Sequence, residues 1–266
     1  MKKKILKPID QPAYLKSSSA LYLSQTFWRI LRNIMGKKSW TFFYKLSQKI
    51  KIRNKLQQLK EENLNLKDNL NYPTKTKEEK EIKKYSFYLD RYKSSKAYGD
   101  YRFFLDETFY NLKNNINTIL EIGISYGAGI LSLKDYFHNS YLWGVDIDRN
   151  TFLKDKQIVK CEWVDQLKIN SLQESAKKFN VKFDLIIDDG WHHPESQMNS
   201  LIAYLPYLNF GGLYIVEDIV HKDYYTQFQK IKKVLEEKNF KVEYKKFTAE
   251  DRVDILGFLI IYRKPQ

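Results

Sequence analysis

Short apolar runs that alternate with helical stretches constrain this chain more than any other feature. Runs that resemble strands end at Gly123 (INTILEIG), Ile147 (YLWGVDI), Asp189 (FDLIIDD) and Asp218 (GGLYIVED), and further strands are expected near 158–164, 242–248 and 255–264. Helical patterns cover 101–113, 126–138, 170–179, 194–207 and 223–239. This alternation is typical of crossover units that build a parallel sheet with helices on both faces. We therefore predict an α/β fold, a doubly wound, seven-stranded and mostly parallel sheet whose last two strands form an antiparallel pair.

Basic charge gathers at the start of the chain. The sequence has 46 Lys and Arg and 32 Asp and Glu, and the first 60 residues hold 15 of the basic residues and one acidic residue. The other residues carry 31 of each sign. This asymmetry predicts a basic helical appendage over 1–84 and a core domain over 85–266. A single cysteine, Cys161, and the lack of an 18-residue apolar run favour a soluble protein of the reducing cytoplasm.

Within the appendage, residues 20–35 place apolar side chains three and four residues apart, with Arg29 and Arg32 on other faces. One interpretation is an amphipathic helix that rests on an anionic membrane, which would place the protein at its inner face. The alternative is a helix that packs on the core domain or on a partner. Clustered basic charge would also suit nucleic acid, but charge alone is weak evidence for that partner.

Residues 52–70 show a heptad pattern, with side chains alternately four and three residues apart at Ile52, Leu56, Leu59, Asn63, Leu66 and Leu70. This spacing predicts a coiled-coil homodimer in which Asn63 would set the register. Fewer than three heptads are present, so an ordinary amphipathic helix is the alternative.

The ends of the first two predicted strands indicate a nucleoside ligand. The first runs into a glycine-rich turn, E-x-G-x-x-x-G-x-G, formed by Glu121, Gly123, Ser125, Tyr126, Gly127 and Gly129. Such glycines let the backbone turn tightly and approach a ligand closely. A carboxylate before the turn would repel a pyrophosphate but not a zwitterionic or cationic ligand. Asp146, which ends the next strand, has the spacing of an acid that binds ribose hydroxyls.

With these residues the chain resembles the class I S-adenosylmethionine-dependent methyltransferases, which have a Rossmann-like fold. The resemblance implies that the turn from Glu121 to Gly129 faces the amino-acid portion of the cofactor and that Asp146 holds its ribose. Asp165 and Gln166 match more loosely a position beside the adenine.

Acidic residues and histidines follow the fourth and fifth principal strands. Asp188, Asp189, His192 and His193 follow one strand end, and Glu217 and Asp218 follow the other. Adjacent strand ends would bring these side chains together, and a divalent cation would relieve the repulsion between their carboxylates. Oxygen ligands favour Mg²⁺, Ca²⁺ or Mn²⁺, and an imidazole beside the ion can accept a proton from a hydroxyl. The alternative is a capping acid with solvated histidines.

The segment from Phe183 to Asp218 resembles the macrocin and mycinamicin sugar O-methyltransferases, in the pattern D-D-G-x-H followed by G-G-x-Y-x-x-E-D. The resemblance implies metal ligands at Asp189, Glu217 and Asp218, a general base at His192 with His193 as a second candidate, and Asp188 beside the cofactor. Trp191 stands where the family has a small serine. Tyr98, Tyr101 and Phe104 either line the site or belong to the core.

These observations predict a Mg²⁺-dependent enzyme that methylates a sugar hydroxyl of a surface glycan or a glycosylated metabolite. A nucleic-acid methyltransferase is one alternative, although the charge-balanced core domain and the absence of an N-P-P-Y-like motif count against it. A scaffold that assembles glycan-synthesis enzymes through its heptads is another.

Overall fold

A computed structural model describes residues 50–51, 53–62, 83–98, 101–148, 158–219, 222–247 and 256–265. From Lys51 onward these residues belong to one compact unit. Residues 50–51 and 53–61 are helical, and the later helices are α2 (Tyr85–Arg91), η2 (Ser95–Tyr98), α3 (Tyr101–Leu112), α4 (Ala128–Tyr136), α5 (Ile169–Phe179), α6 (Pro194–Tyr204), η4 (Leu205–Tyr207) and α7 (Lys222–Glu236). The strands are β1 (Thr118–Ile122), β2 (Tyr141–Asp146), β3 (Ile158–Trp163), β4 (Phe183–Asp188), β5 (Leu208–Val216), β6 (Phe240–Phe247) and β7 (Leu256–Arg263). None of the described helices is long and apolar enough to cross a membrane.

The described strands form one seven-stranded sheet in the order β3-β2-β1-β4-β5-β7-β6. The first five strands pair in parallel, and β7 runs antiparallel to both β5 and β6. The predicted α/β class, the mostly parallel sheet and the antiparallel closing pair are thus confirmed. Because β1, β2, β4 and β5 are parallel, their carboxyl ends lie along one edge of the sheet. The strand order reverses at β1, with β2 on one side and β4 on the other, which is where ligands of such sheets bind.

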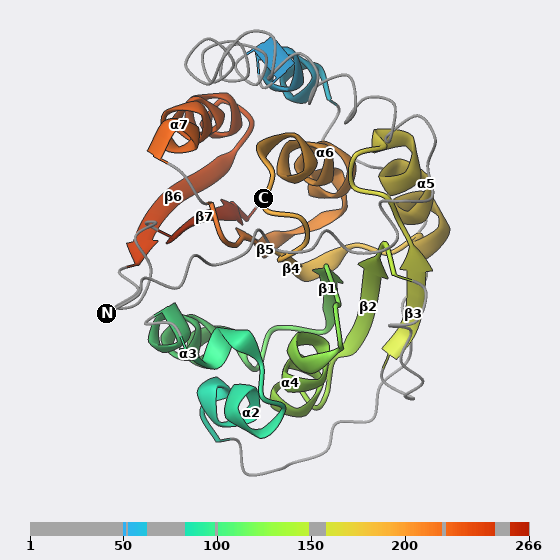
Figure 1. Ribbon diagram of the computed structural model, residues 1–266, viewed down its shortest axis with the longest axis vertical. Helices are drawn as coiled ribbons and strands as arrows, with labels where there is room; N and C mark the ends of the chain where they lie inside the picture. Colours follow the sequence, from blue (N-terminus) through green and yellow to red (C-terminus); the bar gives the residue numbers. More distant parts are fainter. Residues whose placement is uncertain are drawn as a thin grey trace, which may run out of the picture. The chain divides into compact units, whose positions relative to one another are not determined.

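Helices cover both faces of this sheet (Figure 1). The helices α2, α3 and α4 lie on one face, and α5, α6 and α7 lie on the other. Strand β4 shows how one sequence serves both layers, because Ile186 packs in the core beneath α5 and α6 while its neighbours Leu185 and Ile187 pack in the core beneath α2 and α4. Successive side chains of a strand point to opposite faces, so a strand covered on both faces is apolar throughout.

The helical residues 53–61 contribute to the core on the α5–α7 side. Leu56 and Leu59 are buried in that core, at 7% and 0% exposure, although the heptad interpretation assigns both to a seam between two chains. In this part of the segment the alternative, an ordinary amphipathic helix, describes the packing. Residues 20–35 and the predicted seam positions Ile52, Asn63, Leu66 and Leu70 lie outside the described residues.

The helix that contains Leu56 and Leu59 shares a core with α6. Every residue of α6 except Glu195 is buried, as expected for a helix covered on more than one side. Lys51 Nζ forms an ion pair with the Glu195 carboxylate at 2.8 Å, and Lys238 Nζ donates a hydrogen bond to the Glu62 carbonyl at 2.8 Å. The domain core therefore includes a helix that the boundary predicted at residue 84 leaves outside it.

Candidate functional site

The glycine-rich turn after β1 crosses the loop after β4 at close range. Gly123 has φ +88°, and a Cβ at this position would lie 2.7 Å from the Asp189 carbonyl carbon and 2.5 Å from Gly190 Cα. Gly127, also left-handed at φ +85°, is the N-cap residue directly before α4. A Cβ at Gly129 would overlap the Glu121 carboxylate, which lies against the first turn of α4. Both kinds of contact need glycine, which is the reason for the spacing seen in the sequence.

Asp146, at the end of β2, holds this turn in place. Its Oδ2 accepts a hydrogen bond from the Ser125 backbone N–H at 2.8 Å, and its Oδ1 accepts one from the Asp148 N–H at 2.7 Å. The two strand ends predicted to share a nucleoside are therefore joined directly. Ser125 adopts a left-handed φ of +50°, and the side chain of Tyr126 is 95% exposed beside it.

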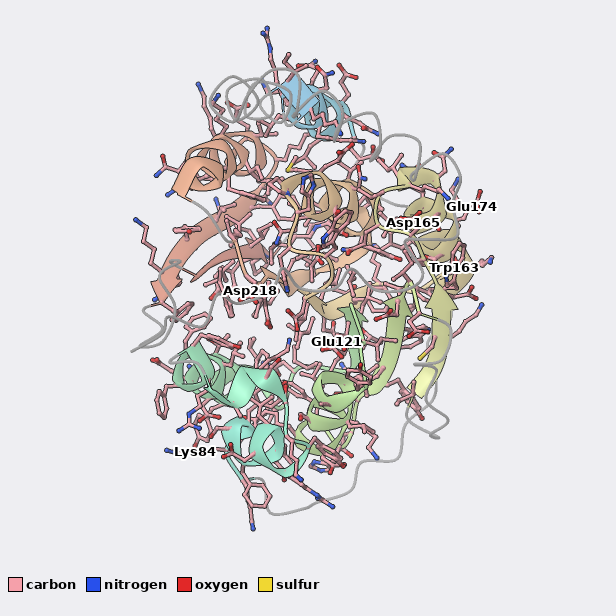
Figure 2. All side chains as sticks on the ribbon, viewed as in Figure 1. Lys84, Glu121, Trp163, Asp165, Glu174 and Asp218 are labelled. Atoms are coloured by element: carbon pink, nitrogen blue, oxygen red, sulfur yellow. The ribbon has the colours of Figure 1, made fainter. Side chains whose placement is uncertain are left out.

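Gln166 connects the loop after β3 with the end of β4. Its Nε2 donates to Asp188 Oδ1 at 3.0 Å and to Ser200 Oγ at 2.9 Å, and its Oε1 accepts from the Trp191 N–H at 2.6 Å. The side-chain amide thus has three protein partners. Asp165 lies farther along the same edge (Figure 2), where its Oδ1 accepts from the Leu167 N–H at 3.0 Å.

Two buried carboxyl groups sit at the strand ends. Burial raises the pKa of Asp188 to about 7, although hydrogen bonds from Gly190 and Gln166 lower it in part. Burial likewise raises the pKa of Glu121 to about 8, despite the opposing effect of the nearby Lys96 ammonium. The second oxygens of both groups, Asp188 Oδ2 and Glu121 Oε2, are buried without a hydrogen-bond partner among the described residues.

Asp189, His192 and Asp218 form the group best suited to hold a metal ion. One ligand atom from each lies within 4.8 Å of the others. His192 Nε2 lies 3.9 Å from Asp189 Oδ1 and 3.6 Å from Asp218 Oδ2. Figure 2 shows Glu121 and Asp218, which belong to the ends of β1 and β5, at this edge of the sheet. The predicted meeting of the two acidic strand ends is thus present.

Glu217 belongs to a different arrangement, centred on Lys96 of η2. The Lys96 ammonium nitrogen lies 3.0 Å from Glu217 Oε2, 3.0 Å from Asp189 Oδ2 and 3.7 Å from Glu121 Oε1. Burial raises the pKa of Glu217 well above its usual range, and Lys96 opposes that rise. Lys96 was missed in the sequence, because the segment YKSSKAY does not distinguish it from the other lysines; its burial is the only signal, and that requires the fold.

The two adjacent histidines point to different surroundings. Whereas His192 lies beside the two aspartates, the His193 ring stacks on Trp191, with ring centroids 5.4 Å apart. Burial lowers the pKa of His193, and Glu195 opposes the shift. His193 also precedes α6, whose first residue is Pro194. The geometry therefore brings His192, rather than His193, to the carboxylates.

The aromatic residues before β1 divide between core and site edge. Tyr101 is buried, and its ring lies 5.0 Å from Phe258 and 5.9 Å from Phe247. Phe104 packs against the same two rings. Burial raises the pKa of Tyr101, and the negative charges of Glu217 and Asp218 raise it further. The side chain of Tyr98 lies outside the described residues.

The sheet order, the antiparallel β7, the glycine-rich turn after β1 and the acidic residue at the end of β2 are features of a Rossmann-like fold, the fold that the class I S-adenosylmethionine-dependent methyltransferases have. In sequence the chain is similar to sugar O-methyltransferases. It is 33% identical over 121 residues to the demethylmacrocin O-methyltransferase of Streptomyces fradiae, a match that covers 43% of this chain and 30% of the relative. The mycinamicin VI 2''-O-methyltransferase of Micromonospora griseorubida is 30% identical over 121 residues, with the same coverage of 43% and 30%. The resemblance drawn from the sequence is confirmed.

The match spans about a third of the length of these curated relatives. Among solved structures, the MycE methyltransferase from the mycinamycin biosynthetic pathway, in complex with Mg and SAH, covers 52% of this chain and 37% of its own, with 26% identity and a TM-score of 0.47. No protein-family model matches the chain.

Proposed function

We propose that this chain transfers a methyl group from S-adenosylmethionine to a sugar hydroxyl, with the help of a divalent cation such as Mg²⁺. The observation that carries the proposal is the position of His192, whose Nε2 lies within 4 Å of the carboxylates of Asp189 and Asp218. This group shares one sheet edge with the glycine-rich turn and Asp146. The named activities of the curated relatives, all O-methyltransferases of glycosylated products, support the choice of acceptor.

The turn after β1 and the end of β2 would hold the cofactor. Glu121, Gly123, Ser125, Tyr126 and Gly127 would face its amino-acid portion, and Asp146 would accept hydrogen bonds from its ribose. The unpartnered Glu121 Oε2 suits a cationic group such as an α-ammonium. Asp165 and Gln166 would border the adenine, with Gln166 acting through the contacts that fix the β4 loop, and Asp188 would lie beside the cofactor.

Asp189 and Asp218 would hold the divalent cation, together with Glu217 when it is released from Lys96. The donor set fits, because hard cations prefer carboxylate oxygens, and a carboxylate oxygen of Asp189 lies within 4.8 Å of one of Asp218. When bound, the cofactor supplies an electrophilic methyl group and the cation favours the ionised form of an acceptor hydroxyl.

His192 is the proposed general base. His192 Nε2 would accept the hydroxyl proton as the acceptor oxygen takes the methyl group, and the departing thioether would be S-adenosylhomocysteine. Asp189 and Asp218 stabilise the resulting imidazolium through their negative charge. This edge of the sheet would orient the acceptor oxygen along the line of transfer, and such positioning provides a large part of the acceleration.

The test is transfer of labelled methyl from S-adenosylmethionine into glycan or glycosylated metabolite extracted from cells that lack the protein. We expect label in saccharide, loss of label with EDTA, and restoration by Mg²⁺. His192→Asn should lower the rate by a factor on the order of 10² to 10⁴, the usual contribution of a general base. His138→Asn is the matched control, because His138 follows α4 and lies outside the acidic group. Label that persists under EDTA would contradict the role of the cation, and equal rates in the two variants would contradict the role of His192.

We further propose that the acceptor is a lipid-linked or surface glycan and that the protein acts at the cytoplasmic face of a membrane. Residues 1–49 would contact the anionic lipid there. A deletion that tests the contact should end before Lys51, since the following helix contributes Leu56 and Leu59 to the domain core. Unchanged binding of this deletion variant to anionic vesicles would refute the membrane contact.

A further inference from the structure

We propose that Lys96 sets the affinity of this site for divalent cations, because its ammonium group occupies the position between Asp189 and Glu217 that a cation would otherwise share. Lys96 acts on the cation and not on the reacting atoms, so it is a positioning residue and not a catalytic one. Its replacement by an uncharged residue should tighten cation binding. The inference rests on the proposed function, since it concerns the same cation.

Lys96 reaches the site from outside the sheet. It belongs to η2, a short turn of helix before α3, and its side chain is 5% exposed. The nitrogen lies 3.0 Å from both Glu217 Oε2 and Asp189 Oδ2, and 3.7 Å from Glu121 Oε1. One ammonium therefore serves as the counter-ion for carboxylates at the ends of three different strands, β1, β4 and β5.

The ammonium group does not satisfy these carboxylates completely. Glu217 Oε1 and Glu121 Oε2 are both buried without a hydrogen-bond partner among the described residues. A buried carboxylate oxygen of this kind is costly unless a donor or a cation reaches it. The inner part of the site therefore has the capacity to bind positive charge beyond that of Lys96.

Asp189 divides its two oxygens between two surroundings. Its Oδ2 contacts Lys96, and its Oδ1 faces His192, which in turn lies near Asp218. A divalent cation held by Asp189 Oδ1 and Asp218 could bind with Lys96 in place. A cation that also takes Glu217 would lie within a few ångströms of the ammonium, and the repulsion between them would oppose binding. Lys96 would then have to move toward Glu121, its third partner.

The experiment compares cation binding by the full chain without cofactor. Mn²⁺ affinity is measured by calorimetry and by the electron paramagnetic resonance of free Mn²⁺. We expect Lys96→Met to bind Mn²⁺ roughly tenfold or more tightly than the wild type, because one nearby positive charge is lost. Lys96→Arg, which keeps the charge, should bind like the wild type. Lys160→Met, which removes a lysine paired with Glu162 on β3, controls for net charge and should also bind like the wild type.

A second measurement uses the wild type alone and covers the case in which Lys96→Met does not fold. The Lys96 ammonium resonance, assigned with Lys96→Arg, should shift as Mg²⁺ is added. Unchanged affinity in a folded Lys96→Met, or a resonance that stays unchanged while Mg²⁺ binds, would overturn the inference and leave the proposed function intact. Failure of both the wild type and Lys96→Met to bind any divalent cation would instead refute the cation in the proposed function, and the inference with it.

Discussion

Replacing Gly123 by alanine should destabilise the domain, because of the positive φ at this position and the close approach of the loop after β4. At φ +88° an L-residue costs about 1–2 kcal/mol. The added Cβ would also lie 2.5 Å from Gly190 Cα and 2.7 Å from the Asp189 carbonyl carbon. These are backbone atoms, so no rotamer change relieves the overlap, and forced overpacking adds about 1–3 kcal/mol. We therefore expect a loss of about 2–5 kcal/mol in the free energy of unfolding.

Gly211→Ala is the matched control for this prediction. Gly211 also has a positive φ, +76°, but a Cβ there would have no heavy atom within 4 Å. The smaller conformational freedom of alanine in the unfolded chain affects both variants alike. The control should therefore lose only the conformational cost, about 1–2 kcal/mol. Urea denaturation followed by circular dichroism gives both values, and an equal loss in the two variants would refute the argument from the close approach of the β1 and β4 loops.

Two further predictions concern the core and the buried acids. Leu59→Ala should lower the unfolding free energy by about 2–5 kcal/mol. This loss should not depend on protein concentration, because Leu59 is fully buried in the domain's own core. A loss that disappears at high concentration would instead favour the coiled-coil dimer. Since the pKa of Glu121 in the folded protein, about 8, lies above its ordinary value of 4.5, its contribution to stability is complete below about pH 4.5 and is lost as the pH rises through 8. Denaturation curves at pH 5, 7 and 9 should show less pH dependence in Glu121→Gln than in the wild type, and identical profiles would contradict the raised pKa.

The sequence predicts this fold well because its strands and helices have recognisable local patterns of apolar residues. The run FDLIIDD is apolar at consecutive positions from Leu185 to Ile187, as expected for a strand buried on both faces. The turn after β1 and the acids at the strand ends could be identified for a similar reason, since ligands of such sheets bind at the carboxyl ends of strands. Asp146 and Asp189 therefore occupy the edge that the alternation of strands and helices implies.

The sequence does not predict which residues from distant segments contact one another in the folded chain. The spacing of Leu56 and Leu59 identifies an apolar face but not what covers it, and a three-and-four pattern suits a second chain and the domain core equally. Lys96 is a similar case, because a lysine carries no local sign that it will be buried. The repulsion between clustered carboxylates led to the prediction of a bound divalent cation, whereas the positive charge that this structure shows there is the Lys96 ammonium, at 3.0 Å from Asp189 and Glu217.

The position of β7 between β5 and β6 has a consequence for synthesis on the ribosome. Among the described strands β6 pairs only with β7, and β5 pairs with β7 on the side away from β4. Translation produces β6 before its partner, so β6 must stay unpaired, and β5 must keep one edge open, until residues 256–263 have emerged. Unpaired edges are the surfaces through which nascent chains aggregate. The sheet therefore cannot form strand by strand in the order of synthesis. The free edge of β5 stays open until β7 inserts between β5 and β6.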